Sequence, residues 1–255
     1  MKKNMMFLGM LLVVLCTSKS VYADYLTGNL ISGQYTTFTT QTPSGSATAY
    51  VGHINTTNLT TDHQFTTFCG DYFTSTSSDF GNTGKGQAYG AYSLWDDGLT
   101  IYTGEQKDSI SKVFGYLYGT CFDAETGAMT DKTVSIAMQL VIWEILSETN
   151  DTFSLTEGTY SIKNTGLTVE QNTILTNAES FLNMLITDDW GDLIFTDYDM
   201  TVYVAEGGML ASQTLISIEN TAVPEPASML IFGIGLACGV PALCRRMKKA
   251  RKNEA

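Results

Sequence analysis

Two residue types in this sequence, cysteine and glutamine, occur in contexts that suggest chemistry. With both terminal segments set aside, the chain keeps two cysteines, Cys69 and Cys121. A disulfide between them is the simplest interpretation in an oxidising compartment. Cys69, however, lies in the run Phe68-Cys69-Gly70-Asp71, at the end of an apolar strand. Gln139 lies beside an apolar helical stripe, one turn before Trp143, where the simplest role is a hydrogen bond to neighbouring backbone.

Two other kinds of site have less support. A Cys–His hydrolase would need Cys69 with His53 or His63, and both histidines lie in Thr- and Asn-rich context without an orienting motif. A group of acids before the last strands lacks the spacing of an EF-hand, so a solvated acidic turn is favoured over a Ca²⁺ site. We expect no metal and no cofactor. The acids in question are Asp188, Asp189, Asp192, Asp197 and Asp199.

Charge is distributed unevenly along the 255 residues. Residues 24–223 contain five Lys, no Arg and 24 of the 26 acidic residues, a net charge of −19. A surface of this sign repels phosphates, which argues against nucleic-acid binding. The apolar content of 44% is enough to build a core, so global disorder is excluded.

The first 23 residues have the features of a secretory signal peptide. Lys2 and Lys3 precede an apolar run from Met5 to Cys16, and small residues near Ala23 suit cleavage after it. An uncleaved anchor is the alternative, although the run is short for a membrane span. Residues 24–222 are therefore the expected exported domain.

Residues 223–255 contain three parts in a fixed order. An apolar run from Ala227 to Leu243 would form a helix about 25 Å long at about 1.5 Å per residue, just enough for a thin bilayer. The basic residues after it should stay on the cytoplasmic side, so the segment is predicted to be a membrane anchor. The run is preceded by Val223, Pro224, Glu225 and Pro226 and followed by Arg245, Arg246, Lys248 and Lys249.

This order resembles the PEP-CTERM sorting signal, which combines a Pro-Glu-Pro motif, a short Gly-containing membrane helix and an Arg-rich tail. Gly233, Gly235 and Gly239 fit the pattern. The resemblance implies a Gram-negative bacterium whose exosortase cuts near Pro224–Pro226. It also implies an inner-membrane intermediate and a final location at the cell surface or outside the cell. A plain tail anchor is the alternative.

Patterns between the two ends predict an α+β fold. Abundant Thr and frequent turn residues indicate short strands, whereas apolar residues at helical spacing indicate helices. The expected architecture is a set of antiparallel strands, sandwich- or barrel-like, with a small inserted helical subdomain. Strands are expected at 34–40, 47–53, 64–71, within 151–168, and at 193–196, 200–204 and 214–219, and a loop at 75–90. Helices are expected at 105–118, after a cap at Thr130 or Asp131, and at 169–186.

Three short motifs between Cys69 and Glu148 are similar, in their order, to those of the Cys–Gln thioester domain of bacterial surface adhesins. Phe68-Cys69 supplies an aromatic-Cys motif on a strand, and a helix from Ile110 reaches Gly115-Tyr116. The run from Gln139 to Trp143 supplies a Gln-x-x-Ile-Trp helix. Cys121 is a departure from the pattern, as is an anchor unlike the Gram-positive cell-wall signal.

The resemblance implies that the Cys69 thiolate attacks the Gln139 carboxamide, releases ammonia and closes an internal thioester. A protein amine or a polysaccharide hydroxyl on a partner would then attack the acyl carbon, once per molecule, so the chain is not expected to be an enzyme with turnover. The alternative is a non-covalent structural or polysaccharide-associated matrix protein whose two cysteines are disulfide-bonded or inert. The candidate pocket walls are Phe68, Tyr72, Phe73 and Trp143.

Overall fold

The structure, a computed structural model, describes residues 23–72, 86–123, 128–148, 153–206 and 212–218. The chain divides into two units, Met1–Glu219 and Asn220–Ala255, and every described residue belongs to the first. Phe73, the apolar run of the expected signal peptide and the expected membrane helix lie outside the described residues. Among the helices that are described, none combines the length and apolarity needed to cross a bilayer.

Six antiparallel strands close into a barrel in the order β1-β4-β5-β9-β8-β6. Closure is made where β1 pairs with β6, with Leu26 opposite Gln87. Neighbouring strands therefore satisfy one another's backbone groups around the barrel. The strands are β1 (Asp24–Leu30), β4 (Ile54–Asn58), β5 (His63–Cys69), β6 (Gln87–Ser93), β8 (Met200–Ala205) and β9 (Leu215–Ile218).

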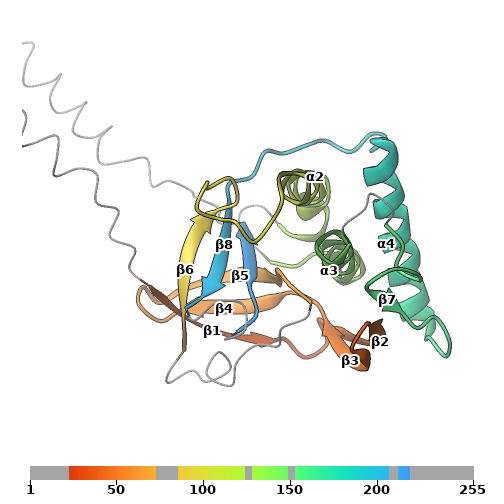
Figure 1. The fold of residues 1–255 in the computed structure, drawn as a ribbon, viewed down its shortest axis with the longest axis horizontal. Helices are drawn as coiled ribbons and strands as arrows, with labels where there is room; N and C mark the ends of the chain where they lie inside the picture. The colour runs from red at the N-terminus through yellow and green to blue at the C-terminus, as the bar shows by residue number, and fades with distance from the viewer. Residues whose placement is uncertain (1–22, 73–85, 124–127, 149–152, 207–211, 219–255) are drawn as a thin grey trace, which may run out of the picture. The chain divides into compact units, whose positions relative to one another are not determined.

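Three helices and a small sheet lie beside the barrel. The sheet has the order β3-β2-β7, from β2 (Thr36–Thr42), β3 (Gly45–Val51) and β7 (Ser161–Ile162). The helices are α2 (Gly104–Cys121), α3 (Lys132–Ser147) and α4 (Val169–Thr187). Figure 1 shows α3 between the barrel and α4, and α3 contacts α2, α4, β3 and β5. The central position of α3 explains why it is apolar on almost every side.

Side-chain caps define where the helices begin. Asp131 accepts hydrogen bonds from the first-turn N–H groups of Thr133 and Val134, and so starts α3. Capping boxes start the other two helices, with Thr103 and Gln106 at α2 and Thr168 and Gln171 at α4. These caps satisfy N–H groups in the first turn of each helix and set where the helix begins.

The predicted α+β class, with antiparallel barrel-like strands and an inserted helical layer, is confirmed. Two local predictions were wrong. The loop expected over residues 75–90 ends earlier, because β6 begins at Gln87 and pairs with both β1 and β8. No strand forms at 193–196, because this segment lies along α2, where Thr196 N–H donates to Gly115 O at 2.8 Å. Within 151–168, the described residues contain only the two-residue strand β7.

Candidate functional site

Cys69 is the last residue of β5, at a point where the strand has lost one of its two neighbours. The ladder between β4 and β5 ends at the pair Ile54–Thr67, whereas the ladder between β5 and β9 continues to Cys69–Leu215. Successive residues of an antiparallel strand direct their N–H and C=O groups to opposite sides. Gly70 N–H donates toward β9, to Thr214 O at 2.7 Å. The backbone groups of Cys69 therefore face the side that β4 has left.

The Gln139 side chain fills this vacated position. Its Oε1 accepts a hydrogen bond from Cys69 N–H at 2.8 Å, and its Nε2 donates to Cys69 O at 3.0 Å. Gln139 is completely buried, and Cys69 is 6% exposed. A buried carboxamide needs partners for both of its polar atoms, and a single residue, Cys69, supplies both. The structure thus brings together the cysteine and the glutamine that the sequence singled out.

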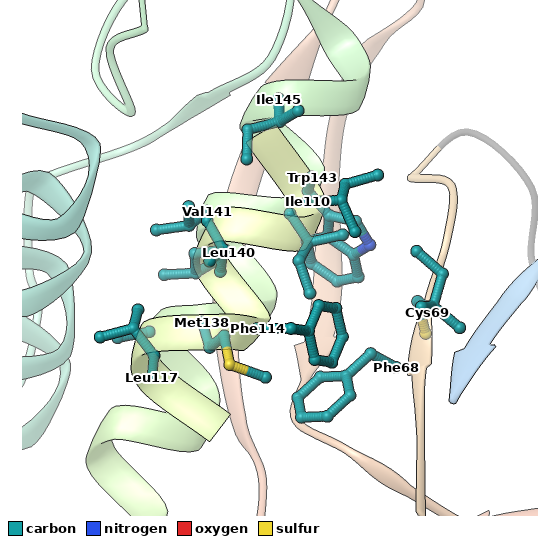
Figure 2. Close-up of a cluster of buried hydrophobic side chains, with 14 of the residues drawn as sticks. Phe68, Cys69, Ile110, Phe114, Leu117, Met138, Leu140, Val141, Trp143 and Ile145 are labelled. Atoms are coloured by element: carbon teal, nitrogen blue, oxygen red, sulfur yellow. The ribbon is translucent and has the colours of Figure 1, made fainter. Parts of the chain in front are cut away.

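The elements around this pair explain why it forms. Gln139 lies in the middle of α3, whose other buried residues pack against α2, α4 and the barrel. The Phe68 ring is turned toward Phe114 of α2 (Figure 2), with ring centroids 5.4 Å apart. Adjacent strand residues point to opposite faces, so Phe68 anchors β5 to the helices while the Cys69 thiol points the other way. Phe68 is therefore part of the packing between the barrel and the helices.

Tyr72 and Trp143 lie together beside the pair. Their ring centroids are 5.1 Å apart, and Tyr160 packs against Tyr72 at 4.4 Å. Trp143 follows Gln139 by one helical turn, so the two side chains share a face of α3. In Figure 2 the indole nitrogen of Trp143 is on the side of its ring nearest the Cys69 strand. This buried Nε1 has no hydrogen-bond partner among the described residues.

A cluster of buried polar residues surrounds Cys69 that sequence reasoning missed. Asp71 is 5% exposed, and its Oδ2 accepts a hydrogen bond from Thr214 N–H at 2.8 Å. Tyr102 donates from its hydroxyl to Gly70 O at 2.6 Å, and Tyr89 donates to Gln213 O at 3.1 Å. Asp71 could have been found from its spacing, two residues after Cys69. The two tyrosines carry no such signal, because they reach the cluster from distant parts of the chain.

The electrostatics of this cluster keep the thiol neutral. Burial, followed by the nearby Asp71 carboxylate, raises the pKa of the Cys69 thiol. Burial also raises the pKa of Tyr89 to about 12 and that of Tyr102 well above its ordinary value. The two hydroxyls therefore stay protonated and act as donors at neutral pH. Any reaction of Cys69 as a nucleophile needs a group that removes its proton.

The second cysteine does not join the site. Cys121 ends α2, and its thiol lies 3.4 Å from Tyr118 O and 3.5 Å from Leu117 O, both in its own helix. Both Cys69 and Cys121 are buried free thiols. The disulfide interpretation is thus not the arrangement that the structure adopts.

The other candidate residues were the histidines and the acids, and the structure places His53 among aromatic side chains. His53 is buried between aromatic rings on the Phe68 side of β5, with its Nδ1 3.2 Å from Ser135 Oγ. Burial lowers the pKa of His53 to about 4, so it is neutral. Within the part of the chain that the structure describes, no three His, Cys, Asp or Glu side chains are grouped to hold a metal ion.

Comparisons with known proteins separate the C-terminal segment from the folded domain. Residues 222–249 match the PEP-CTERM protein-sorting motif, which confirms the predicted sorting signal. No curated protein matches the chain.

Several solved structures are similar to the folded domain. One is the N-terminal thioester domain of the fibronectin-binding protein SfbI from Streptococcus pyogenes, with 12% identity and a TM-score of 0.44, covering 79% of this chain and 95% of that one. Another is the N-terminal domain of the Streptococcus pyogenes pilus tip adhesin Cpa, with 15% identity and a TM-score of 0.45, covering 80% and 96%. A third is the N-terminal thioester domain of a Clostridium perfringens surface protein, with 14% identity and a TM-score of 0.39, covering 72% and 99%.

Proposed function

We propose that this is an exported surface protein in which Cys69 and Gln139 form an internal thioester for covalent attachment to a partner nucleophile. One observation carries the proposal: the Gln139 carboxamide is bound at both ends by the backbone of Cys69. The reacting sulfur, bonded to Cβ, belongs to the same residue whose backbone N–H and C=O groups hold the amide. The amide is therefore held at the residue that carries the sulfur.

Holding two reactants in this way supports a reaction that is slow in water. An amide is a poor electrophile, and fixed geometry can supply roughly 7–11 kcal/mol of the barrier. Attack of sulfur on the carboxamide carbon places negative charge on Oε1, which already accepts the Cys69 N–H bond at 2.8 Å. That N–H is a preorganised oxyanion donor. The unpartnered indole N–H of Trp143 is a second donor available beside Gln139.

Burial would protect the thioester product from hydrolysis. A thioester in water hydrolyses, and this one would lie where Gln139 is completely buried and Cys69 almost so. Ammonia leaves from Nε2, so the hydrogen bond from Nε2 to Cys69 O is lost while the bond to Oε1 is kept. An amine or hydroxyl of a partner then attacks the acyl carbon, and the Cys69 thiol is regenerated. The reaction occurs once per molecule, so the protein is not a turnover enzyme.

The sorting motif supports the cellular setting of this chemistry. A PEP-CTERM segment at 222–249 favours processing by an exosortase in a Gram-negative cell, with a membrane-bound intermediate before release to the surface. The matching partner is a surface or matrix molecule that presents a protein amine or a polysaccharide hydroxyl.

A second candidate function is favoured by the same two hydrogen bonds. A buried amide that satisfies a strand end is also a purely structural device, which stabilises β5 without reacting. The protein would then be a non-covalent structural or polysaccharide-associated matrix component with inert cysteines. This candidate leaves the carboxamide and the thiol chemically intact.

Mass spectrometry of the full-length chain separates the two candidates. The wild type and Cys69→Ala are prepared side by side, so that any processing of the ends affects both equally. If the thioester forms, the measured mass of the wild type is lower than its calculated mass by one ammonia. Cys69→Ala, which cannot form the bond, keeps its full calculated mass. Methylamine should then add to Gln139 and expose one thiol at Cys69, and peptide mapping locates both. An unmodified wild-type mass with no methylamine adduct supports the structural candidate.

A further inference from the structure

We propose that Asp71 is the proton-transfer residue of the site, taking the proton from the Cys69 thiol and delivering it to the departing nitrogen of Gln139. This inference rests on the proposed thioester and names the residue that makes it form. The observations behind it are the position of Asp71, the way its carboxylate is held, and the chemical need created by burial of Cys69.

Asp71 follows Cys69 by two residues, across a bend at Gly70. Contacts with the segment that leads into β9 fix its position. Strand-like bonding continues past the end of β5, because Gly70 N–H donates to Thr214 O at 2.7 Å. The next contact of this run is made by the Asp71 side chain, which accepts from Thr214 N–H at 2.8 Å. The carboxylate is therefore fixed at Thr214, the neighbour of Leu215, which pairs with Cys69 in the β5–β9 ladder.

The surrounding groups leave Asp71 as the base. Two tyrosine hydroxyls, Tyr89 and Tyr102, share the cluster with Cys69 and Asp71, and each donates a hydrogen bond to a backbone carbonyl. Their raised pKa values keep them protonated, so neither accepts a proton at neutral pH. Asp71 is the carboxylate that contributes to the raised pKa of the Cys69 thiol. The carboxylate that disfavours a free thiolate is the group to which we assign the proton that the thiol loses during attack.

The chemical need follows from burial. The thiolate is the nucleophile, and a buried thiol beside a carboxylate holds its proton. The leaving group is equally demanding, because an amide nitrogen must gain a proton before it departs. One carboxylate that accepts a proton and then donates it meets both needs, as general base and then as general acid.

The complete step balances. Cys69 S–H gives its proton to the Asp71 carboxylate as sulfur bonds to the carboxamide carbon of Gln139. The protonated Asp71 then passes this proton to the amide nitrogen, the C–N bond breaks, and ammonia leaves. The products are the Cys69–Gln139 thioester, one ammonia and an Asp71 carboxylate. In the transfer step an attacking amine loses its proton to Asp71, which returns it to the Cys69 sulfur as the thioester opens.

The variant that tests this role is Asp71→Asn in the full-length chain. The substitution keeps the shape of the side chain and an oxygen that can accept from Thr214 N–H, and it removes the basic carboxylate. We expect thioester formation, followed by the loss of one ammonia, to slow by about 10²–10⁴-fold, the usual contribution of a positioned acid–base group. The remaining rate should rise about tenfold per pH unit, because hydroxide must now supply the thiolate.

Controls and alternative outcomes are defined by the structure. Asp97→Asn removes the same charge from an exposed position and should form the thioester at the wild-type rate. If Asp71→Asn does not fold, Asp71→Ala with added formate is the second test, because formate replaces the missing carboxylate and should restore the reaction with rising concentration. Wild-type rates in Asp71→Asn, or folded Asp71→Ala without formate rescue, overturn the role of Asp71 and leave the thioester standing. A wild type that never loses ammonia overturns both proposals.

Discussion

Gln139 is joined to Cys69 across 70 residues of chain by two hydrogen bonds that replace a missing strand neighbour of β5. The pairing depends on two independent facts about the fold. The β4–β5 ladder ends at Thr67, two residues before Cys69. The single glutamine of α3 is buried and lies against Cys69. Neither fact alone would place a carboxamide against a cysteine backbone.

Removal of each cysteine in turn should separate reaction from packing. Cys69→Ala should abolish methylamine labelling of Gln139 while the chain stays folded, because the Gln139 bonds go to the Cys69 backbone and remain. Cys121→Ala should keep full labelling and lower the free energy of unfolding by about 1 kcal/mol, because a buried sulfur is lost from the end of α2. Labelling by peptide mass spectrometry and thermal unfolding measure the two effects. Equal destabilisation by both substitutions, with no labelling in the wild type, would contradict this assignment.

Gly70 tests how tightly the site is packed. A Cβ atom added there would lie 2.5 Å from the Tyr102 hydroxyl, 3.0 Å from Ile216 Cγ1 and 3.1 Å from Thr214 Cγ2. Gly70→Ala should therefore displace the Tyr102 hydroxyl, destabilise the fold by about 1–3 kcal/mol and reduce methylamine labelling. Gly104→Ala is the matched control, because its added Cβ meets no atom within 4 Å and alanine favours the start of α2. Unfolding in denaturant and labelling yield are compared for both variants; equal behaviour would show that Gly70 is not confined.

Glu144 gives the fold a dependence on pH. Burial raises the pKa of this α3 carboxyl to about 8, its Oε1 accepts from Ser154 N–H at 2.7 Å, and Glu148 and Tyr160 are the titratable groups coupled to it. The folded state binds this proton more tightly than the unfolded state, so stability is greatest at low pH and falls as pH rises from about 4.5 to about 8.

Glu144→Gln should remove that dependence, because an amide does not titrate and its oxygen still accepts from Ser154. The variant should match the wild type near pH 5 and exceed its free energy of unfolding by about 2 kcal/mol near pH 8. Glu157→Gln, at an exposed position, is the control and should change neither end of the curve. Denaturant unfolding at several pH values in this range measures the free energy of unfolding of both proteins. A difference between them that does not change with pH would contradict the raised pKa of Glu144.

The sorting motif predicts a specific processing defect. Replacing Pro224 and Pro226 by Ala should leave the chain at full C-terminal length in a host with an exosortase, because the recognised motif within 222–249 is lost. Glu254→Ala changes a residue outside the matched segment and should be processed normally. The C-terminal peptide of the chain, detected by mass spectrometry, reports the outcome. Normal shortening of the Pro variant would show that another signal directs cleavage.

Local patterns in the sequence predicted those parts of the fold that local physics decides. The cap at Asp131 and the apolar stripe of the following helix predicted α3, and the alternating apolar residues before Cys69 predicted β5. Gln139 was identifiable because a carboxamide on an almost wholly apolar helix needs a partner. The identity of that partner was available only from the resemblance of ordered motifs, since nothing local links residues 69 and 139.

The features that escaped prediction depend on distant contacts. β6 carries small and aromatic residues beyond a Gly- and Ser-rich stretch, and its strand state depends on β1 and β8 on either side. The run at 193–196 has strand-like composition, but its exposed backbone bonds to α2 instead. Tyr89, on β6, and Tyr102, just before α2, join the cluster from distant parts of the chain. Composition alone cannot predict a polar cluster whose members are distant in the sequence.

The separation of Cys69 and Gln139 along the chain has a consequence for the unfolded protein. In the proposed thioester state the two residues are covalently joined, which closes a loop of about 70 residues in every unfolded conformation. By the chain-entropy relation used for disulfides, such a cross-link stabilises the folded state by about 4 kcal/mol. Transfer of the acyl group to a partner opens the loop and returns that entropy to the unfolded chain. In this proposed cycle the protein is therefore less stable against unfolding after it has become attached to a partner than before.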